Sequence, residues 1–112
     1  MWYASSLLFK SVHVNHADAD PVWEERIVLL EAWDDAEARD LAGRMGKDGE
    51  HEYYVSKAKN DLLRWTFVQI HKLYPIEDAT LHSGSELFSR FLRQGDVDNL
   101  LRPFEDGDTK TE

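Results

Sequence analysis

The chain has 112 residues, of which 42% are hydrophobic and 31% charged, and its formal net charge is −9. This length favours a single domain with a small core. Because the chain has no cysteine, disulfides, thiolate metal sites and cysteine nucleophiles are excluded. Nucleic acids and anionic membranes both attract basic surfaces, so neither is an expected partner, and a basic partner suits the charge better.

The N-terminal segment predicts a strand. Residues 2–14 alternate loosely between apolar and polar or small side chains, which places Tyr3, Leu7 and Phe9 on one face. The first ten residues lack a basic leader and a long apolar core. We therefore predict neither a signal peptide nor a membrane span there, and we expect a cytoplasmic protein.

A hairpin and a helix are predicted next. Turn residues from Asn15 to Pro21 lead into a second strand over residues 22 to about 33. Asp34 and Glu37 have the spacing of a capping box, which predicts a helix over residues 34 to about 46 that Gly46 and Gly49 end. The apolar stripe of this helix is narrow and consists mostly of small residues: Ala38, Leu41, Ala42 and Met45.

The next pattern predicts a second hairpin. Residues 51–57 predict a third strand, residues 58–61 a turn, and residues 62–74 a fourth strand that Pro75 stops. Residues 86–92 fit an amphipathic helix and a strand equally well. A short helical turn is predicted within residues 98–104, and residues 105–112 predict a disordered acidic tail after a single domain of residues 1–104.

This order of elements predicts the fold class. Two strands, a helix and two strands indicate an α+β fold, with an antiparallel sheet of four to five strands and one helix packed on a face. Apolar residues fall on both faces of the second and fourth strands. We therefore expect the second face to be covered, either by the C-terminal segment or by another copy of the chain.

Five segments resemble a family. They are Trp2–Ala4, Trp23–Leu29, Glu37–Ala38, Trp65–Val68 and Gly84–Arg90, and together they are similar to the small bacterial domain of unknown function family 4288, DUF4288. The resemblance spans residues 1 to about 92 and is most specific at the second and last of these segments. It implies an α+β fold and no known activity, and it carries over no catalytic or binding residue.

The predicted turn before the fourth strand departs from the family pattern. A glycine is expected near Asn60, where this chain has Asn60 followed by Asp61 and Leu62. The type of hairpin turn is therefore left open at this point.

The charged second strand is the first candidate site. Strand alternation puts Trp23 and Glu25 on one face and Glu24 and Arg26 on the other, so the two carboxylates cannot act as an acid and base pair within one strand. One hypothesis joins these residues across the fold into a pocket of Trp23, Glu24, Glu25, Arg26, Trp65, Glu86 and Arg90. The preferred interpretation is an ion-pair network that fixes the C-terminal segment onto the sheet.

Two further candidates carry less weight. Residues His13, His16, Asp18 and Asp20 surround the first hairpin loop and offer imidazole and carboxylate ligands, but a solvated acidic loop is the preferred interpretation. No metal and no cofactor is therefore expected. Trp33 follows a strand directly before an acidic helix start, and it is the tryptophan that we expect at an interface.

Two functional hypotheses follow. The first is a small protein-interaction module, either a homodimer or a partner-binding domain, with an acidic inhibitor of the immunity type as one specific version. The second is a small-ligand binder or enzyme that uses the Glu, Arg and Trp pocket. The sequence favours the first, because phosphate-binding loops, nucleophile elbows and metalloprotease motifs are all absent from it.

Overall fold

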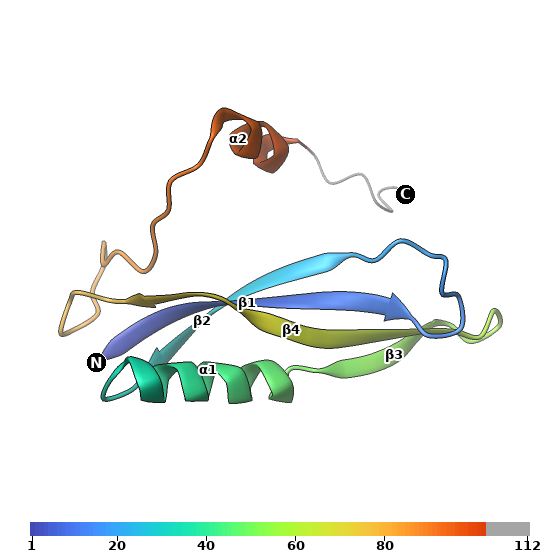
Figure 1. Ribbon diagram of the computed structural model, residues 1–112, viewed down its shortest axis with the longest axis horizontal. Coiled ribbons are helices and arrows are strands. Elements are labelled where there is room, and N and C mark those ends of the chain that lie inside the picture. The colour runs from blue at the N-terminus through green and yellow to red at the C-terminus, as the bar shows by residue number, and fades with distance from the viewer. Residues whose placement is uncertain (103–112) are drawn as a thin grey trace.

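The structure is a computed structural model that describes residues 1–102. Four strands and two helices follow one another along the chain (Figure 1). They are β1 (Trp2–His13), β2 (Trp23–Glu31), α1 (Asp35–Asp48), β3 (His51–Ser56), β4 (Asp61–Pro75) and α2 (Gln94–Leu101). The predicted acidic tail, residues 105–112, lies outside the described residues.

The strands form one antiparallel sheet in the order β2-β1-β4-β3. The predicted α+β class and the ββαββ order are confirmed. The turn that joins β3 to β4 contains Asn60, whose φ of 53° lies in the left-handed region. Asparagine tolerates this conformation better than most residues, so Asn60 supplies a backbone geometry that a glycine at the turn would also allow.

One face of the sheet is packed against α1. Tyr3, Leu7 and Phe9 alternate along β1, and each is at most 1% exposed. Ala38 and Ala42 of α1 are also fully buried, which allows the helix to lie close to the sheet. The narrow stripe of small residues predicted for the helix is therefore the surface that packs.

Two bulges in β4 place its apolar residues on the same face. The pairing between β1 and β4 shifts register twice, and His71 and Val68 are left without a partner. As a result Phe67, Ile70 and Leu73, which are three residues apart, all pack against the core on the α1 side. Simple alternation had divided these residues between two faces, so the second face is less apolar than the sequence indicated.

The start of α1 agrees with its predicted cap. The Asp34 carboxylate accepts a hydrogen bond from the Glu37 backbone N–H at 2.9 Å. The Glu37 side chain accepts from the backbone N–H of Trp33 at 2.7 Å, one residue earlier than the capping box requires. The first bond satisfies a donor that the first helical turn leaves free, and the second ties Glu37 to the residue before the N-cap.

The end of α1 differs from the prediction. The helix continues through Gly46 to Asp48, and Gly49 is the C-cap. Gly46 is buried because the Phe67 ring lies against it, so the glycine is there for close packing and not for termination.

The prediction for the C-terminal segment also needs correction. Residues 86–92 form neither the helix nor the strand that their pattern allowed. The last helix, α2, begins at Gln94 and not at Asp98. This start carries no clear signal in the sequence because the N-cap is Arg93, whereas side chains such as Ser, Thr, Asp and Asn usually mark this position.

The close contact at Gly46 gives a test of the packing. A Cβ atom added at Gly46 would lie 2.5 Å from atoms of the Phe67 ring, whereas one added at Gly43 meets nothing within 4 Å. We expect Gly46→Ala to lower the free energy of unfolding by about 1–3 kcal/mol through overpacking. Gly43→Ala, the matched control, should raise it by up to about 1 kcal/mol because alanine favours the helix. Urea unfolding measures both, and equal stabilisation by the two variants would contradict this packing.

Candidate functional site

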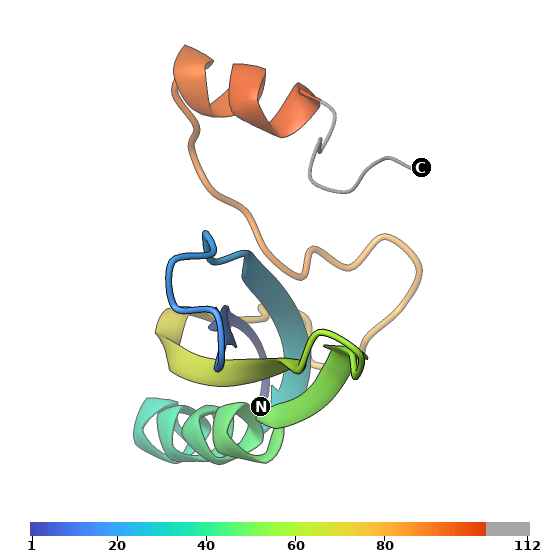
Figure 2. The same cartoon turned by 90° about the vertical axis from the view of Figure 1, so that its right-hand side faces the viewer.

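The sheet face opposite α1 is the candidate site, and we refer to it as the open face. The helix α1 lies on one side of the sheet, and the C-terminal residues 76–102, here named the arm, lie on the other side (Figure 1). A view at right angles shows the same three levels, with the sheet between α1 and α2 (Figure 2). The open face is therefore the surface toward which the arm is directed.

Exposed apolar side chains on β2 mark the open face. Trp23, Ile27 and Leu29 lie on the same face of β2, with Glu25 between Trp23 and Ile27, and they are 51%, 53% and 43% exposed. Leu8 of β1, which pairs with Glu25, is half-buried beside them. Because β2 is an edge strand, this apolar row lies at the border of the sheet, where a partner can reach both the side chains and the strand edge.

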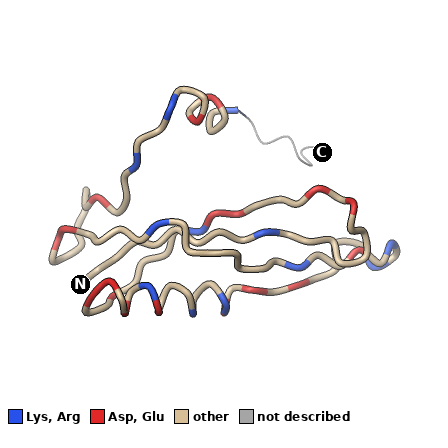
Figure 3. The backbone as a smooth tube through the Cα atoms, in the orientation of Figure 1, with Lys and Arg blue, Asp and Glu red and all other residues tan. Residues whose placement is uncertain are grey.

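The charges on the open face balance one another. The Glu25 carboxylate accepts a hydrogen bond from the buried Ser6 hydroxyl. The Lys10 ammonium lies 5.5 Å from the centre of the Trp23 ring. The face also carries Glu31 on β2, Lys72 on β4 and the ion pair of Arg64 on β4 with Glu52 on β3, so its carboxylates and its cationic groups are equal in number. The acidic excess of the chain therefore lies elsewhere (Figure 3).

The arm is anchored at the end of β4. Ile76 is 2% exposed, and its backbone N–H donates to the carbonyl of Trp2 at 2.9 Å. The Tyr74 hydroxyl donates to the Glu86 carboxylate at 2.6 Å, and the ring of Phe88 meets the Tyr74 ring edge-on with centroids 6.0 Å apart. This hydrogen bond raises the pKa of Tyr74 above its ordinary value, because the neighbouring carboxylate favours the protonated phenol.

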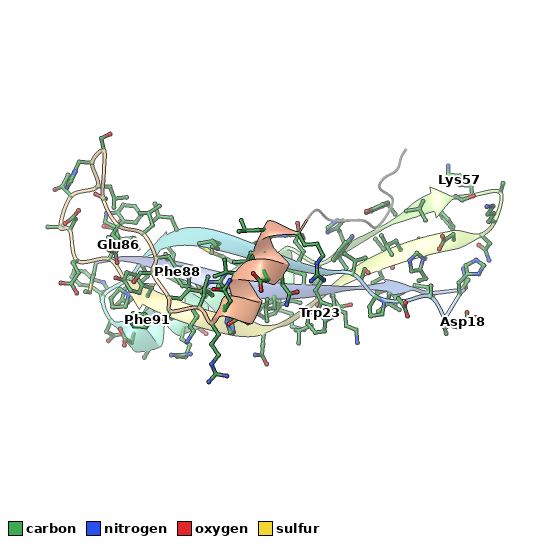
Figure 4. All side chains as sticks on the ribbon, turned by 90° about the horizontal axis from the view of Figure 1, so that it is seen from above. Asp18, Trp23, Lys57, Glu86, Phe88 and Phe91 are labelled. Carbon is green, nitrogen blue, oxygen red and sulfur yellow. The ribbon has the colours of Figure 1, made fainter. Side chains whose placement is uncertain are left out.

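Beyond Phe88 the arm leaves the sheet. No Cα atom of α2 lies within 8 Å of a Cα atom in α1 or in a strand, whereas α1 approaches three strands this closely. Between the arm and the end of β4 lies a groove of about 880 Å³, and Figure 4 shows α2 over the sheet from above. The lining of the groove includes Lys72, Tyr74, Phe88, Arg90 and Asp96.

The arm carries its own exposed apolar side chains. Phe91 is fully exposed, and Leu100 and Leu101 of α2 are 59% and 78% exposed. A phenylalanine with no covering side chain forgoes the whole hydrophobic contribution of its ring. Both the open face and the arm above it therefore leave apolar surface in water.

The pocket predicted from the charged strand is not assembled. Arg26 lies on the α1 side, with its guanidinium 4.0 Å from the centre of the Phe9 ring and its Nε donating to Glu24 at 2.9 Å. Trp23 and Glu25 are on the open face, as alternation predicted, so the sheet itself separates the two pairs.

The other members of that predicted pocket lie elsewhere. Trp65 is on β4 in the α1-facing core, and its indole N–H donates to the Tyr53 hydroxyl at 3.4 Å. Glu86 contacts Tyr74, and Arg90 lines the groove. Glu86 therefore bonds to Tyr74 of β4, and Glu24 bonds to Arg26 of its own strand. These two carboxylates do not form the predicted network between β2 and the C-terminal segment.

Comparison with known proteins supports the family assignment. The model of the domain of unknown function DUF4288 matches residues 2–89, which is more than three quarters of the chain. The chain belongs to the DUF4288 family. No curated protein and no solved structure matches it. The matched region of this DUF4288 domain contains the sheet, α1 and the Glu86–Phe88 anchor, whereas α2 lies beyond it.

The weak metal candidates do not come together in this DUF4288 domain. The His13 ring lies 2.8 Å from the Asp61 carboxylate, and the His16 ring contacts the carbonyl of Lys59 at 3.1 Å. Within residues 1–102 no group of three or more histidine or carboxylate side chains is placed to hold a metal ion. In the same part of the chain no helix has both the length and the apolar character needed to cross a bilayer.

Trp33 is exposed but lies away from the open face. Its side chain is 89% exposed in the loop between β2 and α1. There it lines a separate hollow of about 430 Å³ with Met1, Glu37 and Leu41. Its exposure agrees with a surface position, whereas its predicted role at an interface stays a prediction. The sequence predicted that the second sheet face is covered, but it did not single out Ile27, Leu29 and the apolar residues of the arm as site residues. The period-two spacing of Ile27 and Leu29 on the face of Trp23 was the signal that could have found the first two.

The anchor of the arm predicts a pH dependence. Because the pKa of Tyr74 is raised above 10 in the folded state, the contact with Glu86 contributes its full stability below pH 10 and loses it as the pH rises through the raised pKa. We expect Glu86→Ala to move the Tyr74 pKa down toward 10. Titration of ¹³C-labelled tyrosine by NMR measures this shift, with Glu77→Ala as a neighbouring charge control. An unchanged Tyr74 pKa in Glu86→Ala would contradict the anchor.

Proposed function

We propose that this DUF4288 domain is a protein-interaction module that binds through the open face and the arm. The observation that carries the proposal is the set of exposed apolar side chains on β2, Trp23, Ile27 and Leu29, in a domain whose opposite sheet face packs against α1. Soluble domains seldom leave a contiguous apolar surface in water unless a partner covers it.

The magnitudes indicate that both surfaces take part. Fully burying a large apolar side chain contributes about 1.5–3 kcal/mol, so three side chains that are already half covered contribute roughly half of that each. Association costs about 4–15 kcal/mol in lost translational and rotational freedom alone. The row on β2 is therefore too small by itself, whereas the addition of Phe91, Leu100 and Leu101 of the arm about doubles the apolar contribution.

The small-ligand alternative has less support. The groove beneath the arm has the volume of a ligand site, about 880 Å³, and it contains cationic and aromatic side chains. The residues proposed for catalysis, however, are divided between the two faces of the sheet and the arm. A general acid and base must lie within hydrogen-bond reach of one substrate atom, and Glu24 and Glu25 point to opposite sides.

If this domain is an acidic inhibitor of a basic protein, that protein would bind on a surface other than the open face. A strongly basic partner would favour the acidic first turn of α1, where Asp34, Asp35 and Glu37 lie, over the balanced open face. A salt titration of binding separates the two modes. Binding through the apolar face should be insensitive to salt, whereas a basic partner on α1 should dissociate as ionic strength rises.

The experiment places a charge on the apolar row. We expect Ile27→Lys combined with Leu29→Lys to reduce capture of binding partners, including further copies of the chain, by at least about tenfold in a cross-linking pull-down from the source cell, a loss equal to roughly 1.4 kcal/mol. Trp33→Lys is the control, because it adds a lysine at an exposed aromatic residue away from the face, and each single variant, Ile27→Lys and Leu29→Lys, matches it in added charge. Circular dichroism confirms that each variant is folded. Equal capture by wild type and the double variant would contradict the proposal.

A further inference from the structure

We infer that the occupant of the open face is the arm of a second copy of the same chain, so that two copies clasp each other. The inference rests on the proposed function and names its partner. Every chain carries both halves of the interface, an apolar face and an apolar arm. Two-fold symmetry allows this pairing to form twice, because each half on one copy then meets the other half on its neighbour.

The geometry of the arm supports exchange between chains. The Tyr74 and Glu86 hydrogen bond and the Phe88 ring fix the start of the arm, while Phe91 and α2 stay away from the chain's own sheet. Figure 4 shows Phe91 and Trp23 at separate places along the molecule, with α2 above the sheet between them. The arm is thus already held in an extended position over the groove, and a second chain can enter without breaking a packed contact of α2.

The charges favour a second copy of this chain over a different protein that is strongly basic or strongly acidic. Residues 89–102 hold three arginines and two aspartates, a net charge of +1 in a chain of net charge −9. The open face offers Glu25 and Glu31 to those arginines, and Lys10 and Lys72 to those aspartates. Because the acidic excess lies outside the open face and outside residues 89–102, these two surfaces can meet without bringing an excess of like charges together.

The absence of cysteine makes a disulfide test specific. We pair Ile27→Cys on the open face of one chain with Phe91→Cys on the arm of another, with an affinity tag on one of the two so that the mixed product has its own mass. In a mild thiol redox buffer we expect the mixed disulfide to accumulate at least about tenfold above the pairing of Trp33→Cys with Phe91→Cys, as an equilibrium advantage of about 1.4 kcal/mol requires. Trp33→Cys is the matched control because Trp33 is exposed but lies off the face.

Light scattering on the untagged wild type gives the second readout. A mass of about 26 kDa, twice the 13.0 kDa of the chain, together with the preferred mixed disulfide, supports the clasped dimer. A different result overturns the clasped dimer: the wild type is a monomer, and a disulfide forms only within a single chain that carries both Ile27→Cys and Phe91→Cys. The arm then closes on the open face of its own chain.

The remaining outcomes separate this inference from the proposed function. A monomer without either disulfide that still captures another protein through the open face overturns the second copy and leaves the interaction module intact. A monomer that captures nothing overturns both. A dimer whose disulfide forms equally well with Trp33→Cys also overturns the clasp, because its copies then meet on another surface.

Discussion

The packing of α1 against β1 and β4 decides the use of every other surface in this domain. Phe9, Leu7 and Tyr3 of the central strand are buried beneath the helix, and the alanines of α1 allow it to lie close. A sheet has two faces, and the structure describes one helix packed on it. The apolar row of β2 on the other face is therefore left to the arm or to a partner.

The two bulges in β4 show how the chain concentrates its apolar residues under α1. Because His71 and Val68 have no partner in β1, both odd-numbered and even-numbered residues of β4 face the helix. Polar side chains such as Lys72 and Gln69 are left on the open face. The open face thus carries Trp23, Ile27 and Leu29 along β2, together with Glu25 and Glu31, and polar side chains such as Lys72 along β4. That division suits an interface with an apolar part and a polar rim better than a second hydrophobic core.

Local chemistry made much of this fold predictable from the sequence. Alternation gave β1 and β2 and assigned Trp23 and Arg26 to opposite faces, and Asp34 marked the start of α1. The bulges were missed because they depend on pairing with a distant strand, and Gly46 was misread because its neighbour Phe67 is remote in sequence. The same holds for Glu86: nothing local indicates that its partner is Tyr74 and not a residue of β2.

Hydroxyl-radical footprinting at low and high protein concentration tests directly whether a second copy covers the open face, as we infer. We expect Trp23, Ile27 and Phe91 to become protected together as the concentration rises, while Trp33 stays reactive throughout. Unchanged reactivity of Trp23, Ile27 and Phe91 over a range in which the chain self-associates would contradict it.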